Sequence, residues 1–237
     1  DMELCLKDLE TVDKRPDKER KAAKVGSREA QAACQALEKA KSALEEFLPV
    51  RTVAFTDDEN DVISSLQLLT AKPILYVCNV DEASAVNGNK YVDAVREAVK
   101  AENAEVLVLA AATEADITEL ETYEERKMFL DEIGLEEPGV SRLIRSAYKL
   151  LRLQTYFTAG PKEVKAWTIP VGATAPQAAG VIHSDFEKGF IRAEVIKYDD
   201  YVSLGSEAKV REAGKLHVEG KEYIVADGDV MHFRFNV

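Results

Sequence analysis

Apolar residues recur at intervals of three and four along the first 56 residues, a spacing that places them on one face of a helix. The second of two such stretches contains Ala30, Ala33, Cys34, Leu37, Ala40, Leu44, Phe47 and Leu48. The first carries Leu4, Leu6, Leu9 and Val12, and Pro16 and Gly26 interrupt the pattern between them. Two amphipathic helices joined by a short connection pack best side by side, so residues 1–56 are predicted to form an antiparallel helical hairpin, or coiled coil.

Helices and short apolar runs alternate in residues 57–152. Thr56-Asp57-Asp58-Glu59 is a capping box that predicts a helix running toward Pro73, with Val62, Ile63, Leu66 and Leu69 on its inner face. Two continuous apolar runs, 74–78 and 106–109, flank a predicted helix near 90–101 and are typical of buried parallel strands. We expect two more helices near 118–133 and 140–153. This strand–helix–strand order indicates an α/β sheet.

The pattern changes after residue 152 to short strands separated by turns. Strands are expected at 155–158, 165–170, 190–197, 223–225 and 230–235, with one helix near 176–183. This order is typical of a small α+β domain of the β-grasp, ubiquitin-like kind. Trp167 and Phe190 are expected to anchor its core. The predicted fold class is therefore α/β followed by α+β.

The composition excludes several classes of protein. The chain has 237 residues, and 31 Lys and Arg against 43 Asp and Glu give it a net charge of -12, which argues against a protein that coats nucleic acid without specificity. Because no apolar run approaches the ~20 residues that span a membrane and no signal peptide follows Asp1, we expect a cytoplasmic protein without a membrane partner. The scattered cysteines and histidines lack the spacing of a metal site.

The segment Asn79-Val80-Asp81-Glu82 directly follows the first predicted strand, where ligands bind in open α/β sheets. It is similar to the base-reading Asn-Lys-x-Asp motif of P-loop GTPases, with Val80 replacing Lys and Glu82 replacing the Asp that accepts the guanine protons. We therefore expect weakened guanine selection. Taken alone, the motif is weak, and an ordinary loop between strand and helix is the alternative that it favours. Ala110 and Ala111 end the second predicted strand, where small residues allow either a ligand or a helix to approach the backbone.

Four cations, Arg142, Arg145, Lys149 and Arg152, are spaced by three, four and three residues and are predicted to form one basic stripe on a helix. The stripe is a candidate contact for RNA phosphates, and a solvated helix face is the alternative. No G-x-x-x-x-G-K-[ST] phosphate loop occurs in the sequence. No catalytic residue is assigned in this chain.

Several long runs resemble the C-terminal TGS domain of the YchF (EngD) family of Obg-like ATPases. They are LQTYFTAG at 153–160, AWTIPVGATAPQAAG at 166–180 and DFEKGFIRA at 185–193. Shorter matches lie at 114–117, 134–139, 227–230 and 235–237. The resemblance is strong from about residue 72 onward and looser over the helical segment.

The resemblance implies a ribosome-associated P-loop NTPase of the translation-factor class that hydrolyses ATP in preference to GTP and needs Mg²⁺. It implies a helical hairpin at 1–56, the C-terminal half of a nucleotide-binding domain at 57–152 and a TGS domain at 153–237. In this frame the nucleotide-binding residues are Asn79, Val80, Glu82, Ala110 and Ala111. Asn79 would hydrogen-bond the adenine edge, and Val80 would offer its backbone.

The family's phosphate loop, switch regions and catalytic segment have no counterpart in this sequence, and we expect them upstream of Asp1. This chain alone is therefore not expected to hydrolyse ATP. The alternative function is a non-catalytic module that presents the TGS domain and the basic helix to RNA or the ribosome, with no DNA specificity. The sequence leaves the oligomeric state and the cellular process open.

Overall fold

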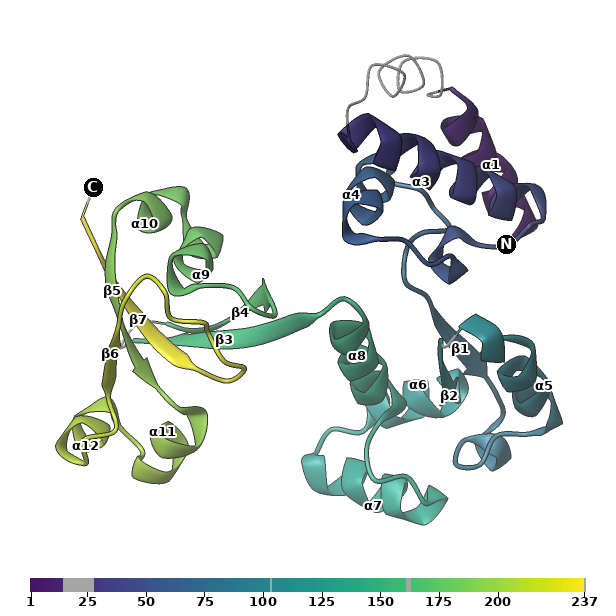
Figure 1. The fold of residues 1–237 in the computed structure, drawn as a ribbon. Coiled ribbons are helices and arrows are strands. Elements are labelled where there is room, and N and C mark those ends of the chain that lie inside the picture. The colour runs from purple at the N-terminus through teal and green to yellow at the C-terminus, as the bar shows by residue number, and fades with distance from the viewer. Residues whose placement is uncertain (15–27, 103, 161–162, 237) are drawn as a thin grey trace. The chain divides into compact units, whose positions relative to one another are not determined.

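The computed structural model describes residues 1–14, 28–102, 104–160 and 163–236. It is a mixed α/β structure whose backbone divides into two compact units, residues 1–143 and 144–237 (Figure 1). The predicted break between the first two helices, at Pro16 and Gly26, lies outside the described residues.

The first unit begins with helices. They are α1 (Met2–Asp13), α3 (Arg28–Glu45), the 3-10 turn η1 (Val50–Thr52) and α4 (Asp57–Leu66). Asp13 pairs with Lys41 at 2.7 Å, and Asp1 at the other end of α1 pairs with Arg51. The start of α1 therefore lies beside η1, and its end lies beside Lys41 of α3.

The buried face of α1 differs from the predicted one. Leu4 and Leu6 are exposed, and the helix buries Cys5, Asp8 and Val12. Asp8 is inside because its carboxylate accepts hydrogen bonds from the backbone N–H groups of Leu69 and Thr70, at 2.8 and 2.7 Å, and from the Thr70 hydroxyl. A buried carboxylate with three donors is well satisfied, and it fixes α1 to the segment that follows α4.

Two predicted helix boundaries are wrong. Helix α3 ends at Glu45, and Phe47, with φ of 57°, turns the chain so that Phe47 and Leu48 are exposed. The Thr56–Glu59 capping box is confirmed, but α4 ends at Leu66, well before Pro73, because Gln67 adopts a left-handed conformation.

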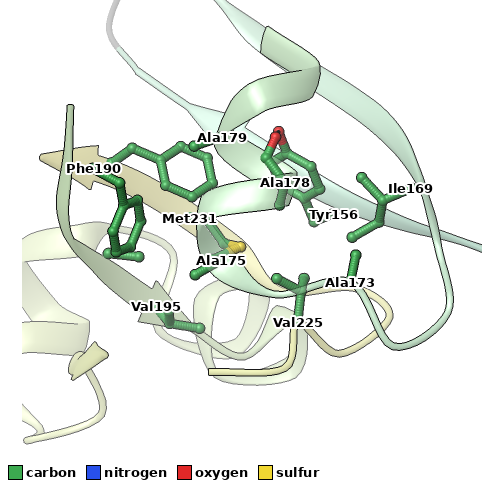
Figure 2. Close-up of a cluster of buried hydrophobic side chains, with 12 residues drawn as sticks. Tyr156, Ile169, Ala173, Ala175, Ala178, Ala179, Phe190, Val195, Val225 and Met231 are labelled. Atoms are coloured by element: carbon green, nitrogen blue, oxygen red, sulfur yellow. The ribbon is translucent and has the colours of Figure 1, made fainter. Parts of the chain in front are cut away.

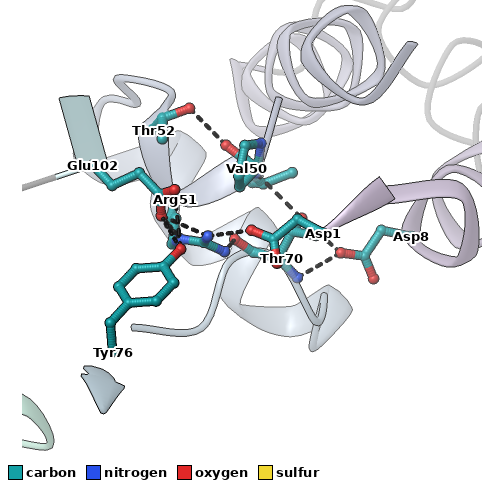
Figure 3. A network of polar contacts seen from close by, with 9 residues as sticks. Asp1, Asp8, Val50, Arg51, Thr52, Thr70, Tyr76 and Glu102 are labelled. Atoms are coloured by element: carbon teal, nitrogen blue, oxygen red, sulfur yellow. Dashed lines mark hydrogen bonds and ion pairs between the residues drawn. The ribbon is translucent and has the colours of Figure 1, made fainter. Parts of the chain in front are cut away.

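A polar network connects η1 to the α/β part of the same unit (Figure 3). The Arg51 guanidinium donates to Glu102 Oε2 at 3.0 Å from Nε and 2.6 Å from Nη2. The Tyr76 hydroxyl, on the first strand, donates to the same carboxylate at 3.1 Å. Burial and the Glu102 carboxylate raise the pKa of Tyr76 above its ordinary value. The helical segment is therefore fastened to the first strand through Glu102.

The parallel pair β1 (Leu75–Asn79) and β2 (Glu105–Leu109) is joined by the helices η2 (Glu82–Ser84), α5 (Lys90–Ala98) and η3 (Lys100–Glu102). The register runs from Leu75 opposite Glu105 to Asn79 opposite Leu109. The strands are less buried than predicted, with Val77 43% exposed and Cys78 half-buried. The reason is that this sheet has only two strands among the described residues.

Three helices follow: α6 (Ala111–Glu119), α7 (Tyr123–Ile133) and α8 (Gly139–Leu150). The single helix predicted near 118–133 is therefore two helices. A capping box between Thr122 and Glu125 starts α7, and Gly134 ends it in a left-handed conformation. The start of α6 differs from the prediction because Ala110 and Ala111, the expected end of the second strand, instead cap and begin this helix.

The second unit contains a mixed five-stranded sheet with the order β4-β3-β7-β5-β6. The strands are β3 (Leu153–Ala159), β4 (Val164–Pro170), β5 (Phe190–Ile196), β6 (His217–Glu219) and β7 (Val230–Phe235). Its helices are α9 (Ala175–Ile182), α10 (Ser184–Lys188), α11 (Tyr198–Leu204) and α12 (Glu207–Glu212). The strand predicted at 223–225 is only an isolated bridge from Ile224 to Thr174.

The core of the second unit lies between the sheet and α9 (Figure 2). Tyr156 is fully buried, and its hydroxyl donates to the Ala178 carbonyl at 2.9 Å. Alanines at the buried positions of α9 let the helix approach the strands closely. Phe190 anchors this core as predicted, whereas Trp167 is only partly buried and donates to Thr158 Oγ1 at 2.9 Å.

Candidate functional site

The carboxyl ends of β1 and β2 are joined by a side chain. Asn79, the last residue of β1, accepts a hydrogen bond at Oδ1 from the backbone N–H of Ala111, with 3.0 Å between the atoms. The neighbouring Val80 N–H donates to the Leu109 carbonyl at 2.9 Å. The loops after both strands are thereby held together at the edge where ligands bind in parallel sheets.

The arrangement leaves Asn79 with one free function. Its carboxamide oxygen is occupied by Ala111, and no partner is recorded for its Nδ2 group among the described residues. The residue is exposed, so this NH₂ group can donate to an acceptor on a ligand. Asn79 and Ala111, predicted separately from two strand ends, therefore meet in one place.

The two alanines have different positions. Ala110 precedes α6 and is 4% exposed, packed among Ala85, Ile117, Leu130 and Leu135. Ala111 is exposed at the first turn of α6. Ala110 therefore serves a tight contact with neighbouring helices. Of the two alanines, only Ala111 leaves its backbone accessible to a ligand.

The rest of the predicted motif points elsewhere. Val80 packs against the cluster that contains Ala110, and Asp81 caps η2 by accepting from the Ser84 N–H at 3.0 Å. Glu82 lines a cavity of about 550 Å³ together with Phe129 and Glu132 of α7, and neither Asn79 nor the two alanines line it. The structure does not bring Glu82 to the Asn79–Ala111 pair.

Sequence reasoning assigned no role to Glu114, which fastens α8 beside this edge. Its carboxylate accepts from the Gly139 N–H at 2.6 Å and the Val140 N–H at 3.2 Å. A Cβ on Gly139 would collide with the side-chain ends of Leu109 and Glu114, so a larger residue there would require both side chains to move. The only sequence signal was an acid in the first turn of α6.

The predicted basic stripe is not one continuous face. The half-buried Arg142 donates from Nη2 to the Val108 carbonyl at 3.1 Å, so it holds the end of β2. Arg145 and Lys149 are exposed on α8, and Arg152 lies beyond the helix with φ of 52°. Three of the four cations thus remain at the surface, and Arg142 serves the fold.

Among the described residues there is no group of three or more His, Cys, Asp or Glu side chains that could hold a metal ion. The donors at the strand edge are an amide and backbone groups, which do not make a Mg²⁺ site, so no Mg²⁺ ligand is assigned here. Within the same described ranges, no helix is both long enough and apolar enough to cross a membrane.

Comparison with known proteins gives consistent matches. The family described as YchF-GTPase_C, protein of unknown function (DUF933), matches residues 153–236. The chain is 51% identical to the Bacillus subtilis protein named ribosome-binding ATPase YchF, over 100% of this chain and 65% of that protein. The protein of the same name from Escherichia coli O157:H7 is 52% identical, over 99% of this chain and 64% of the relative.

A solved structure agrees. The Schizosaccharomyces pombe YchF GTPase superposes with a TM-score of 0.85 at 34% identity, covering 98% of this chain and 64% of that protein. The chain therefore spans somewhat less than two thirds of the length of the relatives it matches. On these matches and the mixed α/β fold, the chain belongs to the YchF family.

Proposed function

We propose that the chain supplies the base-reading edge of a nucleotide site and a ribosome-contacting C-terminal unit in a P-loop NTPase that hydrolyses ATP and, less well, GTP. The observation that carries the nucleotide part is the hydrogen bond from the Ala111 N–H to Asn79 Oδ1. It orients the Asn79 amide so that its free NH₂ group can donate to a purine ring nitrogen.

The chemistry of this contact selects purines and does not separate adenine from guanine, because both bases carry the ring acceptor N7. Guanine selection needs an acceptor for the N1 and N2 protons, and Glu82 lines a different cavity. Without a guanine-specific acceptor, the site is open to ATP as well as GTP. The names of the relatives, ribosome-binding ATPase and YchF GTPase, are consistent with a site that takes both nucleotides.

The described residues would hold the base and not the phosphates. Phosphoryl transfer depends on positioning and on charge neutralisation by a phosphate loop, its Lys and Mg²⁺, and this sequence contains no such loop. In this proposal residues 1–56 form a helical hairpin, 57–152 the C-terminal half of the nucleotide domain and 153–237 a β-grasp TGS domain. The five-stranded sheet packed on α9 supports the last assignment.

A second function, a non-catalytic module that binds RNA or the ribosome, is favoured by the surface cations of the second unit. Arg145, Lys149 and Arg152 are exposed on and just after α8. The name of the relatives, ribosome-binding ATPase, indicates the ribosome as the partner. This function is compatible with the first and does not require a phosphate loop.

One pair of polypeptides tests both functions. In a chimera, this chain replaces the matching segment of the Bacillus subtilis relative. We expect the chimera to release phosphate from ATP faster than from GTP, and this chain alone to release none above background. We expect both polypeptides to co-sediment with ribosomes. ATP turnover by this chain alone, or a chimera that prefers GTP, would contradict the nucleotide part, and failure of both to co-sediment would contradict the ribosome part.

A further inference from the structure

The sheet of the second unit has one face that helices cover only in part. Its inner face packs against α9 and α10, and on its outer face α11 and α12 pack over Ile196 and Val230. Side chains alternate between faces along each strand. The outer face therefore continues from the Ile196–Val230 pair to Glu194 opposite His232 and then to Arg192 opposite Arg234.

This part of the outer face gathers every arginine between residues 153 and 237. There are three, Arg192, Arg211 and Arg234, and they come from β5, α12 and β7. Glu194 lies 3.2 Å from Arg234 and 4.0 Å from Arg211, and Arg211 also pairs with Glu207 at 3.0 Å. Two carboxylates thus stand against three guanidinium groups, on a protein whose net charge is -12.

Arg192 is the cation left over. Its side chain is exposed and has no recorded hydrogen bond or ion pair with any described residue. A β-bulge at Ile191 places it directly across the ladder from Arg234. Like charges at directly opposed positions destabilise a sheet, and bulges commonly re-aim side chains at functional positions. The pair of guanidinium groups is therefore suited to an anion that the protein itself does not supply.

An aromatic cavity opens beside Arg234, and its rings, Phe186 of α10 among them, belong to the inner side of the sheet. The parallel strands β3 and β7 share only one register pair, Phe157 with Val230, and beyond it they separate. The opening is a cavity of about 700 Å³ whose wall includes Trp167, Phe186, Phe235 and Arg234. Phe186 and Phe235 stack with ring centroids 3.8 Å apart. Proteins that bind single-stranded nucleic acids combine aromatic rings, on which bases stack, with cationic side chains that contact the phosphates.

We propose that the second unit binds a single-stranded segment of RNA here, with phosphates on Arg192 and Arg234 of the outer face and a base inserted between β3 and β7 into the aromatic cavity. The inference rests on the proposed ribosome-binding function and names where in the second unit the RNA is held. Guanidinium groups bind phosphate through two parallel hydrogen bonds, which lysine cannot reproduce. A duplex would leave the cavity empty because its bases are already stacked.

Trp167 makes the test direct, because it is the single tryptophan of the chain and lines the cavity. The full chain is titrated with an RNA decamer, with the same decamer as a duplex, and with AMP, while Trp167 fluorescence is followed between 50 and 200 mM salt. We expect quenching by the single strand only. Its affinity should fall with salt by roughly 0.7 log units per phosphate contact for each log unit of salt.

The variants separate this surface from general electrostatics. Arg192→Glu should weaken decamer binding about tenfold or more and make the salt slope shallower by roughly one contact. Arg192→Lys should keep the slope but bind several-fold more weakly than the wild type. The matched control is Lys221→Glu, the same loss of positive charge at an exposed residue outside this surface. A thermal melt checks that each variant is folded.

Each outcome decides one claim. Equal losses in Arg192→Glu and Lys221→Glu, equal quenching by duplex or AMP, or no quenching by the decamer would overturn the inference. If ribosome co-sedimentation persists in any of these cases, the proposed ribosome binding stands and only this surface is wrong. If the wild-type chain does not co-sediment with ribosomes, the proposed function itself fails.

Discussion

The carboxamide oxygen of Asn79 lies 3.0 Å from the backbone nitrogen of Ala111, and this one hydrogen bond connects the ends of two parallel strands. It uses the acceptor side of the amide for the fold and leaves the donor side at the surface. A side chain held in this way is already oriented for a ligand, so little freedom is lost when a purine binds.

Replacing Asn79 by alanine in the chimera should weaken ATP binding by about 1–3 kcal/mol, the cost of leaving a polar atom of the bound purine without its partner. GTP binding should weaken equally, because both purines carry the same ring acceptor. Competition titration with the two nucleotides measures both. The control is Asn87→Ala, which changes an exposed asparagine in the separate cavity beside α7. Equal affinities for both variants would remove Asn79 from the site.

Shortening Glu82 to aspartate tests whether this residue reads the base. Aspartate is the acceptor that guanine selection uses in Asn-Lys-x-Asp motifs. A Glu82 that contacts the base would therefore make Glu82→Asp in the chimera shift the preference from ATP toward GTP. Since Glu82 lines the cavity beside α7, we expect the ratio of the two affinities to stay within about twofold. A shift of tenfold toward GTP would contradict this placement.

Arg142 and Lys149 should separate folding from binding. Arg142→Ala removes the hydrogen bond from Nη2 to the Val108 carbonyl, and we expect the free energy of unfolding to fall by about 1–3 kcal/mol in a urea titration. Lys149→Ala, at an exposed position of the same helix, should change it by less than about 0.5 kcal/mol. If Lys149 contacts RNA, only this variant lowers ribosome co-sedimentation at unchanged stability. If Arg142→Ala instead lowered co-sedimentation without lowering stability, Arg142 would belong to the predicted basic stripe.

The stability of the first unit should depend on pH through Glu59. The ammonium group of Lys39, 2.8 Å away, and the Thr56 N–H hold the pKa of Glu59 below its ordinary value of 4.5. The unfolded chain therefore binds this proton more readily than the folded one. The stabilisation is present above pH 4.5 and is lost as the pH falls through the lower folded pKa.

Urea titrations at a series of acidic pH values should show this loss, and Glu59→Gln should make the decline less steep. The matched control is Asp61→Asn, at an exposed position of the same helix. A decline equally steep in wild type and Glu59→Gln would show that other carboxylates control the acid response.

Local sequence determined the features that depend on neighbouring residues. The Thr56–Glu59 capping box, the parallel pairing of two apolar runs and the glycine that ends α7 were predictable, because caps, strand runs and left-handed turns are set by chemistry within a few residues. The family was also identified from the sequence, because long runs such as AWTIPVGATAPQAAG carry far more information than a four-residue motif.

Tertiary structure alone decided which side chains meet. Periodicity placed Arg142 on a basic stripe, yet its guanidinium is held by the carbonyl of Val108, 34 residues earlier in the chain. Periodicity likewise favoured Leu4 and Leu6 for the inside of α1, whereas Asp8 is buried there because donors from residues 69 and 70 satisfy its charge. Asn79 meets Ala111, and Arg192 meets Arg234, for the same reason. Spacing along a chain sets the faces of an element, but the partner that each face receives comes from residues far away in sequence.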